Sequence, residues 1–189
     1  GIFDKSLTAQ NGPYLSAPAA MPLEDGAAMK VGLVWAGNPR HSNDVNRSAA
    51  LSDFTALTAL GQDVSFYGLQ KGAASDQTPP TGMNFTTLGP ELDDFQDTAS
   101  ALIALDLLIT VDTSVAHLAG ALGRPVWLLL PFVPDWRWLQ DRDDSPWYRS
   151  MRLFRQGEGE NWLTILERVA DTLRNKVEIR IQNTVRSTE

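Results

Sequence analysis

The sequence contains no cysteine, so it offers neither a disulfide framework nor a thiolate for catalysis. It also has no apolar run close to the roughly 20 residues that a transmembrane helix needs. Its first residues, Gly1 to Lys5, are mixed in character and lack the apolar core of a secretory signal. These absences are compatible with a cytosolic protein and argue against a membrane-spanning segment.

Basic residues are in the minority. The 189-residue chain has 16 lysines and arginines against 23 aspartates and glutamates, which gives a formal net charge of -7. A broad nucleic-acid-binding face usually needs a basic stripe, so nucleic acid is not expected as a partner. An anionic small ligand stays open as a partner, provided that its positive contacts are gathered locally.

Signatures of metal and cofactor binding are missing too. The two histidines, His41 and His117, have no thiolates beside them and form no helix-spaced ligand pair, so no metal site is expected. Asp141-Arg142-Asp143 has the Asp-x-Asp spacing of some metal sites. It lies in a polar run away from any predicted strand end, however, which favours a solvated loop. No glycine-rich phosphate loop of the kinase or dehydrogenase type follows a predicted strand, and no cofactor is expected.

The chain does contain a regular alternation of short apolar runs and segments with helical periodicity. Strands are predicted at 31–35, 64–69, 84–88, 107–111, 126–130 and 151–154, and helices at 52–60, 94–105, between 112 and 123, and at 162–173. This alternation predicts an α/β fold, a Rossmann-like parallel sheet of about six strands with helices on both faces. We expect residues 30–175 to form this lobe, 1–29 a linker or arm, and 176–189 a tail that is frayed or docked on a partner.

The segment from Asp112 to Pro125 carries the strongest signal for a ligand site. It would open a helix at the carboxyl end of the buried strand 107–111, where open α/β sheets bind ligands. Asp112 or Thr113 is predicted to cap this helix, and Gly123 to end it. Free amides at the start of the helix, assisted by its dipole, suit a phosphate, although many such turns touch no ligand.

Several segments, taken in order, resemble the C-terminal lobe of a GT-B glycosyltransferase. The resemblance is to family 9, the heptosyltransferase group, in the form often fused to tetratricopeptide repeats in bacteria. The matching segments are 31–39 (VGLVWAGNP), 46–48 (NRS), 69–72 (LQKG), 93–99 (DDFQDTA), 112–131, 135–138 (DWRW), 145–148 (SPWY) and 153–156 (LFRQ). In that family this lobe binds the nucleotide diphosphate sugar, and the other lobe binds the acceptor and supplies the activating carboxylate.

The resemblance implies a donor site and leaves the catalytic residues unknown. It assigns donor and phosphate contacts to Gly37, Asn38, Arg47, Asp112, Thr113, Ser114, Val115, Ala116 and His117, and nucleoside contacts to Gln70 and Lys71. These residues also have possible roles without a ligand. Asp112 and Thr113 can cap the helix, and Arg47 can form an ion pair with Asp44. His117 can order the turn, and Gln70 and Lys71 can be solvated at the surface. A neutral His117 is expected, because the positive helix end disfavours an imidazolium.

The resemblance further implies metal-independent transfer from a nucleotide diphosphate sugar to an acceptor hydroxyl. The acceptor lobe is expected outside this chain, as is any tetratricopeptide segment, and both would be partners on the full-length protein. We expect a cytoplasmic location, with peripheral association with the inner membrane as the alternative. Two other functions stay open: a non-catalytic nucleotide-sugar-binding or interaction module of the same fold, and half of a sugar-nucleotide epimerase.

Overall fold

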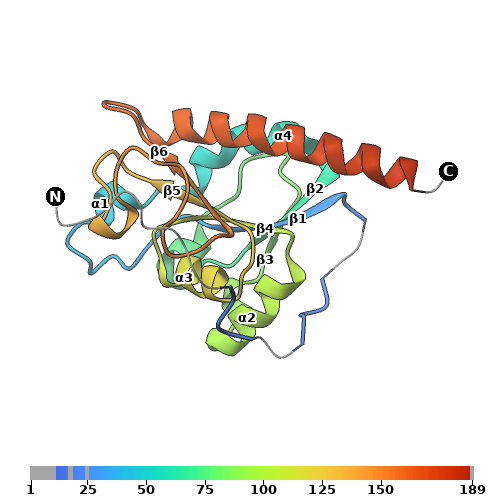
Figure 1. The fold of residues 1–189 in the computed structure, drawn as a ribbon, viewed down its shortest axis with the longest axis horizontal. Helices are drawn as coiled ribbons and strands as arrows, with labels where there is room; N and C mark the ends of the chain where they lie inside the picture. Colours follow the sequence, from blue (N-terminus) through green and yellow to red (C-terminus); the bar gives the residue numbers. More distant parts are fainter. Residues whose placement is uncertain (1–11, 17–18, 24–25, 188–189) are drawn as a thin grey trace.

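The computed structural model describes residues 12–16, 19–23 and 26–187, and a single parallel β-sheet forms its centre (Figure 1). The strands are β1 (Met29–Val34), β2 (Val64–Gly68), β3 (Phe85–Thr87), β4 (Leu107–Val111), β5 (Val126–Leu130) and β6 (Met151–Arg155). They lie in the order β3-β2-β1-β4-β5-β6, and every neighbouring pair is parallel. The predicted Rossmann-like sheet is thereby confirmed.

Helices cover both faces of the sheet, which explains why its central strands are mostly apolar. All residues of β4 and β5 are buried. One face packs against η1 (Leu51–Asp63) and α4 (Trp162–Arg186), and the other against α2 (Phe95–Ala104) and α3 (Ser114–Ala121). In Figure 1, α4 lies above the sheet, and α2 and α3 lie below it.

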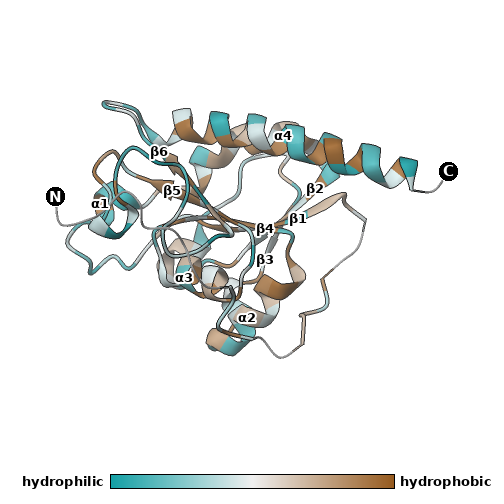
Figure 2. Cartoon of the chain, in the orientation of Figure 1, coloured by the Kyte–Doolittle hydropathy of each residue, from teal (hydrophilic) through white to brown (hydrophobic). Residues whose placement is uncertain are grey.

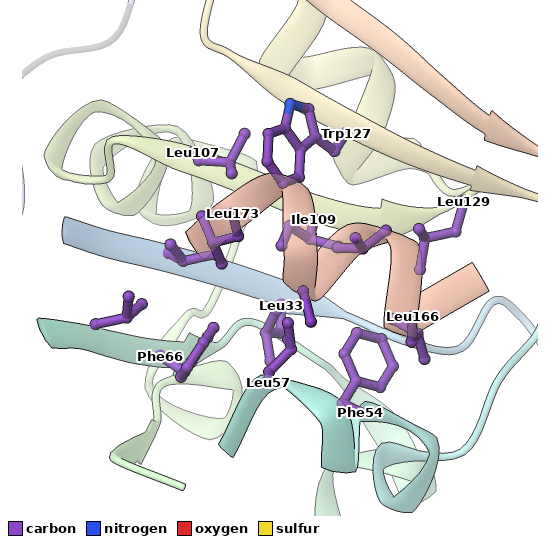
Figure 3. Close-up of a cluster of buried hydrophobic side chains, with 14 of the residues drawn as sticks. Leu33, Phe54, Leu57, Phe66, Leu107, Ile109, Trp127, Leu129, Leu166 and Leu173 are labelled. Atoms are coloured by element: carbon purple, nitrogen blue, oxygen red, sulfur yellow. The ribbon is translucent and has the colours of Figure 1, made fainter. Parts of the chain in front are cut away.

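Alternate residues of each strand serve the two layers, because side chains alternate across a strand. Leu33 and Ile109 belong to the cluster under η1 and α4, where Figure 3 shows them directed toward Phe54 and its neighbours. Val34 and Leu108 belong to the cluster under α2 and α3. Figure 2 shows apolar strands between the helices, and apolar and polar residues that alternate along α4.

Glycine sets two helix boundaries. The helix expected at 52–60 is the 3-10 helix η1, and Gly61 interrupts it with a φ of 56°. After α3, Gly123 adopts a φ of 68°, and the amide of Arg124 donates to the carbonyl oxygen of Ala119 at 2.9 Å. This is the closing bond of a Schellman motif, so the predicted stop at Gly123 is confirmed.

The C-terminal segment differs from its prediction. The tail expected over 176–189 is helical as far as Arg186, as the second half of α4. Val177 is buried in the cluster on this face, and Arg180 pairs with Asp106 at 2.7 Å. These tertiary contacts hold a polar stretch in a helix, and the local sequence gives no sign of them.

Described residues of the N-terminal arm contact the face covered by α2 and α3. The amides of Tyr14 and Leu15 donate to the carbonyl oxygen of Ala121 at 3.0 and 3.1 Å. Further along, the amide of Met21 donates to the carbonyl oxygen of Ser100 in α2 at 3.0 Å. Residues 1–11, 17–18 and 24–25 of the expected arm lie outside the described residues, and Met29, its last residue, is the first residue of β1.

Short helices fill the loops at the carboxyl edge of the sheet. They are α1 (Asp44–Arg47), η2 (Gly72–Asp76), η3 (Gly89–Glu91) and η4 (Trp136–Trp138). The strand order reverses between β1 and β4, and the loops that follow these two strands diverge there, at the position where open α/β sheets bind ligands. Among the helices of the described residues, none combines the length and hydropathy required of a membrane span.

Candidate functional site

A cleft of about 590 Å³ opens where β1, β2 and β4 end. Its walls come from the loops after these strands, from the first turns of α2 and α3, and from η4. The structure brings together all the residues predicted for donor binding except Ala116. Those lining the cleft are Gly37, Asn38, Arg47, Gln70, Lys71, Asp112, Thr113, Ser114, Val115 and His117.

The first turn of α3 faces this cleft with unpaired amides. Thr113 precedes the helix with an extended backbone, and no side chain accepts a hydrogen bond from the turn as a cap. The hydroxyl of Thr113 instead lies 3.3 Å from that of Thr110. Within the described residues, the amides of Ser114 and Val115 have no acceptor. The predicted side-chain cap is therefore wrong, and these donors are available to a ligand.

Ala116 differs from the two residues before it. Its side chain is fully buried in the cluster under α3, and its amide donates to the carbonyl oxygen of Thr113 at 3.1 Å. The amide is already engaged at this point, one residue beyond the free donors. The phosphate contact of Ala116 stays a prediction, with less support than those of Ser114 and Val115.

Arg47 reaches the cleft from α1. Its Nε lies 3.2 Å from Oδ1 of Asp44, and its Nη1 donates to the carbonyl oxygen of Asp112 at 3.0 Å. A Cβ atom at Gly37 would lie 2.5 Å from Nη2, so the absence of a side chain there lets the guanidinium approach the loop after β1. The ion pair with Asp44 is confirmed. The same guanidinium brings a positive charge to the cleft, and its contact with a phosphate stays a prediction.

Gln70 links the ends of two strands. Its Oε1 accepts the amides of Trp35 and Ala36 at 3.1 and 2.9 Å. Its Nε2 donates to the carbonyl oxygens of Ala36 and Lys71, both at 3.1 Å. Two donors and two lone pairs are the whole capacity of a side-chain amide, so these bonds saturate it. Because Gln70 is buried, the alternative of a solvated side chain is wrong. Its nucleoside contact stays a prediction, and in this structure its side-chain amide has no free donor or acceptor for one.

Two other predicted residues keep capacity for a ligand. The Nζ of Lys71 donates to the carbonyl oxygen of Leu92, which leaves two of the three ammonium donors. Lys71 is exposed at the edge of the cleft, and its nucleoside contact stays a prediction. The Oδ1 of Asn38 accepts the amide of Arg40 at 3.0 Å, which shapes the loop after β1 and leaves its side-chain NH₂ group to donate.

His117 lies one turn into α3 and is held on three sides. Its Nδ1 lies 3.0 Å from the hydroxyl of Tyr148, its Nε2 lies 3.8 Å from Oδ1 of Asp112, and its ring stacks on Trp138 at 5.3 Å. Burial lowers the pKa of His117 below its ordinary value of 6.5, and the opposing effect of Asp112 is smaller. The predicted neutral ring is favoured, with burial as the leading cause.

Arg137 lines the cleft and was not among the predicted contacts. Asp135 caps η4 by accepting the amide of Arg137 at 3.0 Å, and its Oδ1 lies 3.3 Å from the Nε of the same arginine. The guanidinium carbon lies 5.7 Å from the ring centroid of Trp136. Trp136 is exposed and Trp138 is buried, so only one of these two neighbouring tryptophans is a core residue. A capping aspartate two residues before an arginine is the local signal that predicts this turn.

Three cationic side chains, Arg47, Lys71 and Arg137, line the cleft together with one carboxylate, Asp112. Asp44 and Asp135, just outside this lining, pair with the two arginines. Apolar contacts that were not predicted complete the wall, among them Leu69 and the half of Phe95 that is exposed at the rim. Across the described part of the chain, no group of three or more His, Cys, Asp or Glu side chains is arranged to hold a metal ion. Such a cleft suits an anion bound by side chains and by the start of a helix.

No protein-family model matches this sequence. Protein FlbA of Caulobacter vibrioides is 34% identical over 82 residues, which are 43% of this chain and 13% of FlbA. ADP-heptose LPS heptosyltransferase II of E. coli superposes with a TM-score of 0.54 and 19% identity, over 82% of this chain.

The chain shares the fold of that heptosyltransferase. The match confirms the α/β fold that the resemblance to the heptosyltransferase group predicted. The chain spans about half the length of the solved enzyme, 47%, and a much smaller part of FlbA.

Proposed function

We propose that this chain is the donor-binding lobe of a glycosyltransferase and that its cleft holds a nucleotide diphosphate sugar. The observation that carries the proposal is the unpaired first turn of α3, whose Ser114 and Val115 amides face a cleft at the switch point of the sheet. An anion at this turn would receive two oriented N–H donors and the positive end of the helix dipole. The guanidinium groups of Arg47 and Arg137, each already paired with one aspartate, would add charge-assisted hydrogen bonds to a diphosphate.

These groups also suit the chemistry of transfer. As the bond between the sugar's anomeric carbon and the phosphate oxygen breaks, negative charge develops on the departing nucleoside diphosphate. Donors that are already fixed stabilise this charge without reorganising. In this cleft, the amides of α3 and the two guanidinium groups would take that role, and metal-independent transfer is part of the proposal.

His117 would contribute a hydrogen-bond donor rather than a positive charge. A carboxylate accepts hydrogen bonds and cannot donate them, so Asp112 favours the tautomer with its proton on Nε2, the nitrogen 3.8 Å away. The hydroxyl of Tyr148 then donates to Nδ1. This tautomer is assigned from the neighbours of the ring. It presents an N–H group at the cleft, where a phosphate or sugar oxygen can accept it.

The rest of the proposal concerns the full-length protein. We assign the acceptor lobe, and the carboxylate that activates the acceptor hydroxyl, to sequence beyond these 189 residues. The coverage of 47% of heptosyltransferase II supports a second lobe of similar size. A tetratricopeptide segment and a cytoplasmic location, free or at the periphery of the inner membrane, belong to the same proposal.

Calorimetric titration with ADP-, UDP- and GDP-linked sugars tests donor binding. We expect one of these series to bind and the corresponding free nucleoside, which lacks the diphosphate, to bind far more weakly. Failure of every nucleotide sugar to bind the folded chain would contradict the proposal. Assaying transfer by the chain with and without its natural flanking sequence then separates a transferase lobe from a module that only binds.

A further inference from the structure

A second pocket adjoins the cleft on the side of η4. It has a volume of about 400 Å³, within the range of about 300–1,000 Å³ that is usual for small-molecule sites. Its lining residues are Tyr14, His117, Trp136, Arg137, Trp147 and Tyr148. His117 and Arg137 also line the cleft, so the two spaces share a wall.

We propose that this aromatic pocket binds a pyranose ring, an inference that rests on the proposed donor function. A pyranose presents an apolar C–H face that stacks on a flat aromatic ring, and a rim of hydroxyl groups that needs hydrogen-bond partners. The pocket supplies both, with indoles from Trp136 and Trp147, hydroxyls from Tyr14 and Tyr148, and the guanidinium of Arg137.

The two indoles are held in place and yet open to solvent. The Nε1 of Trp147 donates to the carbonyl oxygen of Arg137 at 2.7 Å, but 43% of the residue is exposed. Trp136 is 56% exposed, with the Arg137 guanidinium over its ring. An anchored indole gives contact area at little cost in side-chain entropy. Apolar surface kept exposed at the wall of a pocket is typical of a binding site.

The N-terminal arm closes the pocket through Tyr14. The amide of Tyr14 donates to Ala121 at 3.0 Å, and its hydroxyl hydrogen-bonds to that of Tyr148. Burial, followed by this bond to Tyr14, raises the pKa of Tyr148 above its ordinary value, so the hydroxyl stays protonated, donates to Nδ1 of His117 and keeps an oxygen lone pair that can accept. Beneath this ring lies Gly120, where a Cβ atom would lie 2.5 Å from Tyr148. A glycine at position 120 therefore leaves room for the ring of Tyr148 to form a wall of the pocket.

The shape of the pocket favours a sugar over a nucleobase. The rings of His117 and Tyr148 meet at 62°, with their centroids 5.8 Å apart, and form a corner rather than a parallel slot. A flat base is best held between parallel faces, whereas a puckered ring with hydroxyls at its rim fits a corner with polar edges. A phosphate at the start of α3 would leave its glycosyl group beside this corner. Both the sugar of the donor and a saccharide acceptor contain a pyranose ring, so the pocket fits either one.

Paired titrations test the inference. ADP, UDP and GDP are each compared with ADP-glucose, UDP-glucose and GDP-mannose on the wild type, on Trp147→Ala and on Trp136→Ala. Phe132→Ala is the matched control, since Phe132 is 53% exposed in the loop after β5 and lines neither pocket. We expect both tryptophan variants to lose about 3- to 10-fold in affinity for the nucleotide sugar and to keep their affinity for the diphosphate. A melting curve checks each variant, and Trp136→Ala decides the matter if Trp147→Ala fails to fold.

The outcomes separate the inference from the proposed function. A loss of equal size for the diphosphate and its sugar conjugate would assign the pocket to the nucleoside and overturn the inference, as would unchanged affinities. If the wild type binds none of the six compounds, the donor function fails and the inference falls with it. Methyl glucoside titrated onto the diphosphate complex distinguishes the two sources of the ring. If methyl glucoside binds and its binding depends on Trp147, the pocket holds a saccharide acceptor. If methyl glucoside does not bind, while the tryptophan variants lose affinity only for the nucleotide sugar, the pocket holds the donor sugar.

Discussion

Replacing Ser114 with proline would remove one amide donor from the candidate phosphate site and leave the geometry of α3 in place. Ser114 is the first residue of this helix, where proline breaks no intrahelical bond and its fixed φ suits the helix. The preceding residue, Thr113, has a φ of -137° and a ψ of 169°, and this extended conformation is the one that a following proline favours. The substitution therefore tests the amide with little disturbance of the fold.

The expected effect of Ser114→Pro follows from the loss of one hydrogen bond to a charged group, about 1.5–3 kcal/mol. This corresponds to a loss of about 10- to 150-fold in affinity for the nucleotide sugar, measured by calorimetry. Ser114→Ala is the matched control, because it removes the hydroxyl and keeps the amide, and its affinity should stay close to that of the wild type. An unchanged affinity in Ser114→Pro, with a normal melting curve, would refute the placement of a phosphate on this turn.

Three further predictions concern the same site. Arg47→Ala should weaken nucleotide-sugar binding by about 1–3 kcal/mol in the same calorimetric assay, and an unchanged affinity would remove this side chain from the site. Because the pKa of folded His117 lies below 6.5, the unfolded chain binds more protons near that pH, so the free energy of unfolding should fall as the pH drops from 7 through 6.5. Urea unfolding should show a smaller fall for His117→Gln, and equal falls would contradict the argument. Gly120→Val should lower stability by about 1–3 kcal/mol, because the new side chain overlaps the ring of Tyr148, and a wild-type melting curve would count against that packing.

The fold was predictable wherever burial shapes a continuous stretch of sequence. Strands β4 and β5 occupy 107–111 and 126–130, the residues predicted, because a parallel strand covered on both faces reads as an uninterrupted apolar run. The order of the strands was not predictable, since the sequence records alternation but does not say which strands pair. The second half of α4 was missed because distant contacts, such as the ion pair of Arg180 with Asp106, hold its polar residues in a helix.

The candidate site was predictable where the backbone supplies the chemistry. A helix that opens directly after a buried strand places its free amides at the edge of the sheet, whatever its side chains are. Side-chain roles were harder to predict. Three of the four hydrogen bonds of the Gln70 side chain are to Trp35 and Ala36, in the loop after β1, so the sequence around Gln70 does not show that its amide is saturated. Arg137 reaches the cleft because Asp135 shapes the turn that precedes it.

Amide-resolved NMR titration tests the central claim most directly. UDP, ADP and GDP are added in turn, each beside its free nucleoside, and the shifts of the backbone amides are followed. We expect the bound diphosphate, and not its nucleoside, to move the amides of Ser114 and Val115 the most. Phosphate-dependent shifts centred elsewhere would contradict the account, for example at the groove of about 890 Å³ lined by Lys176 and Arg180 of α4.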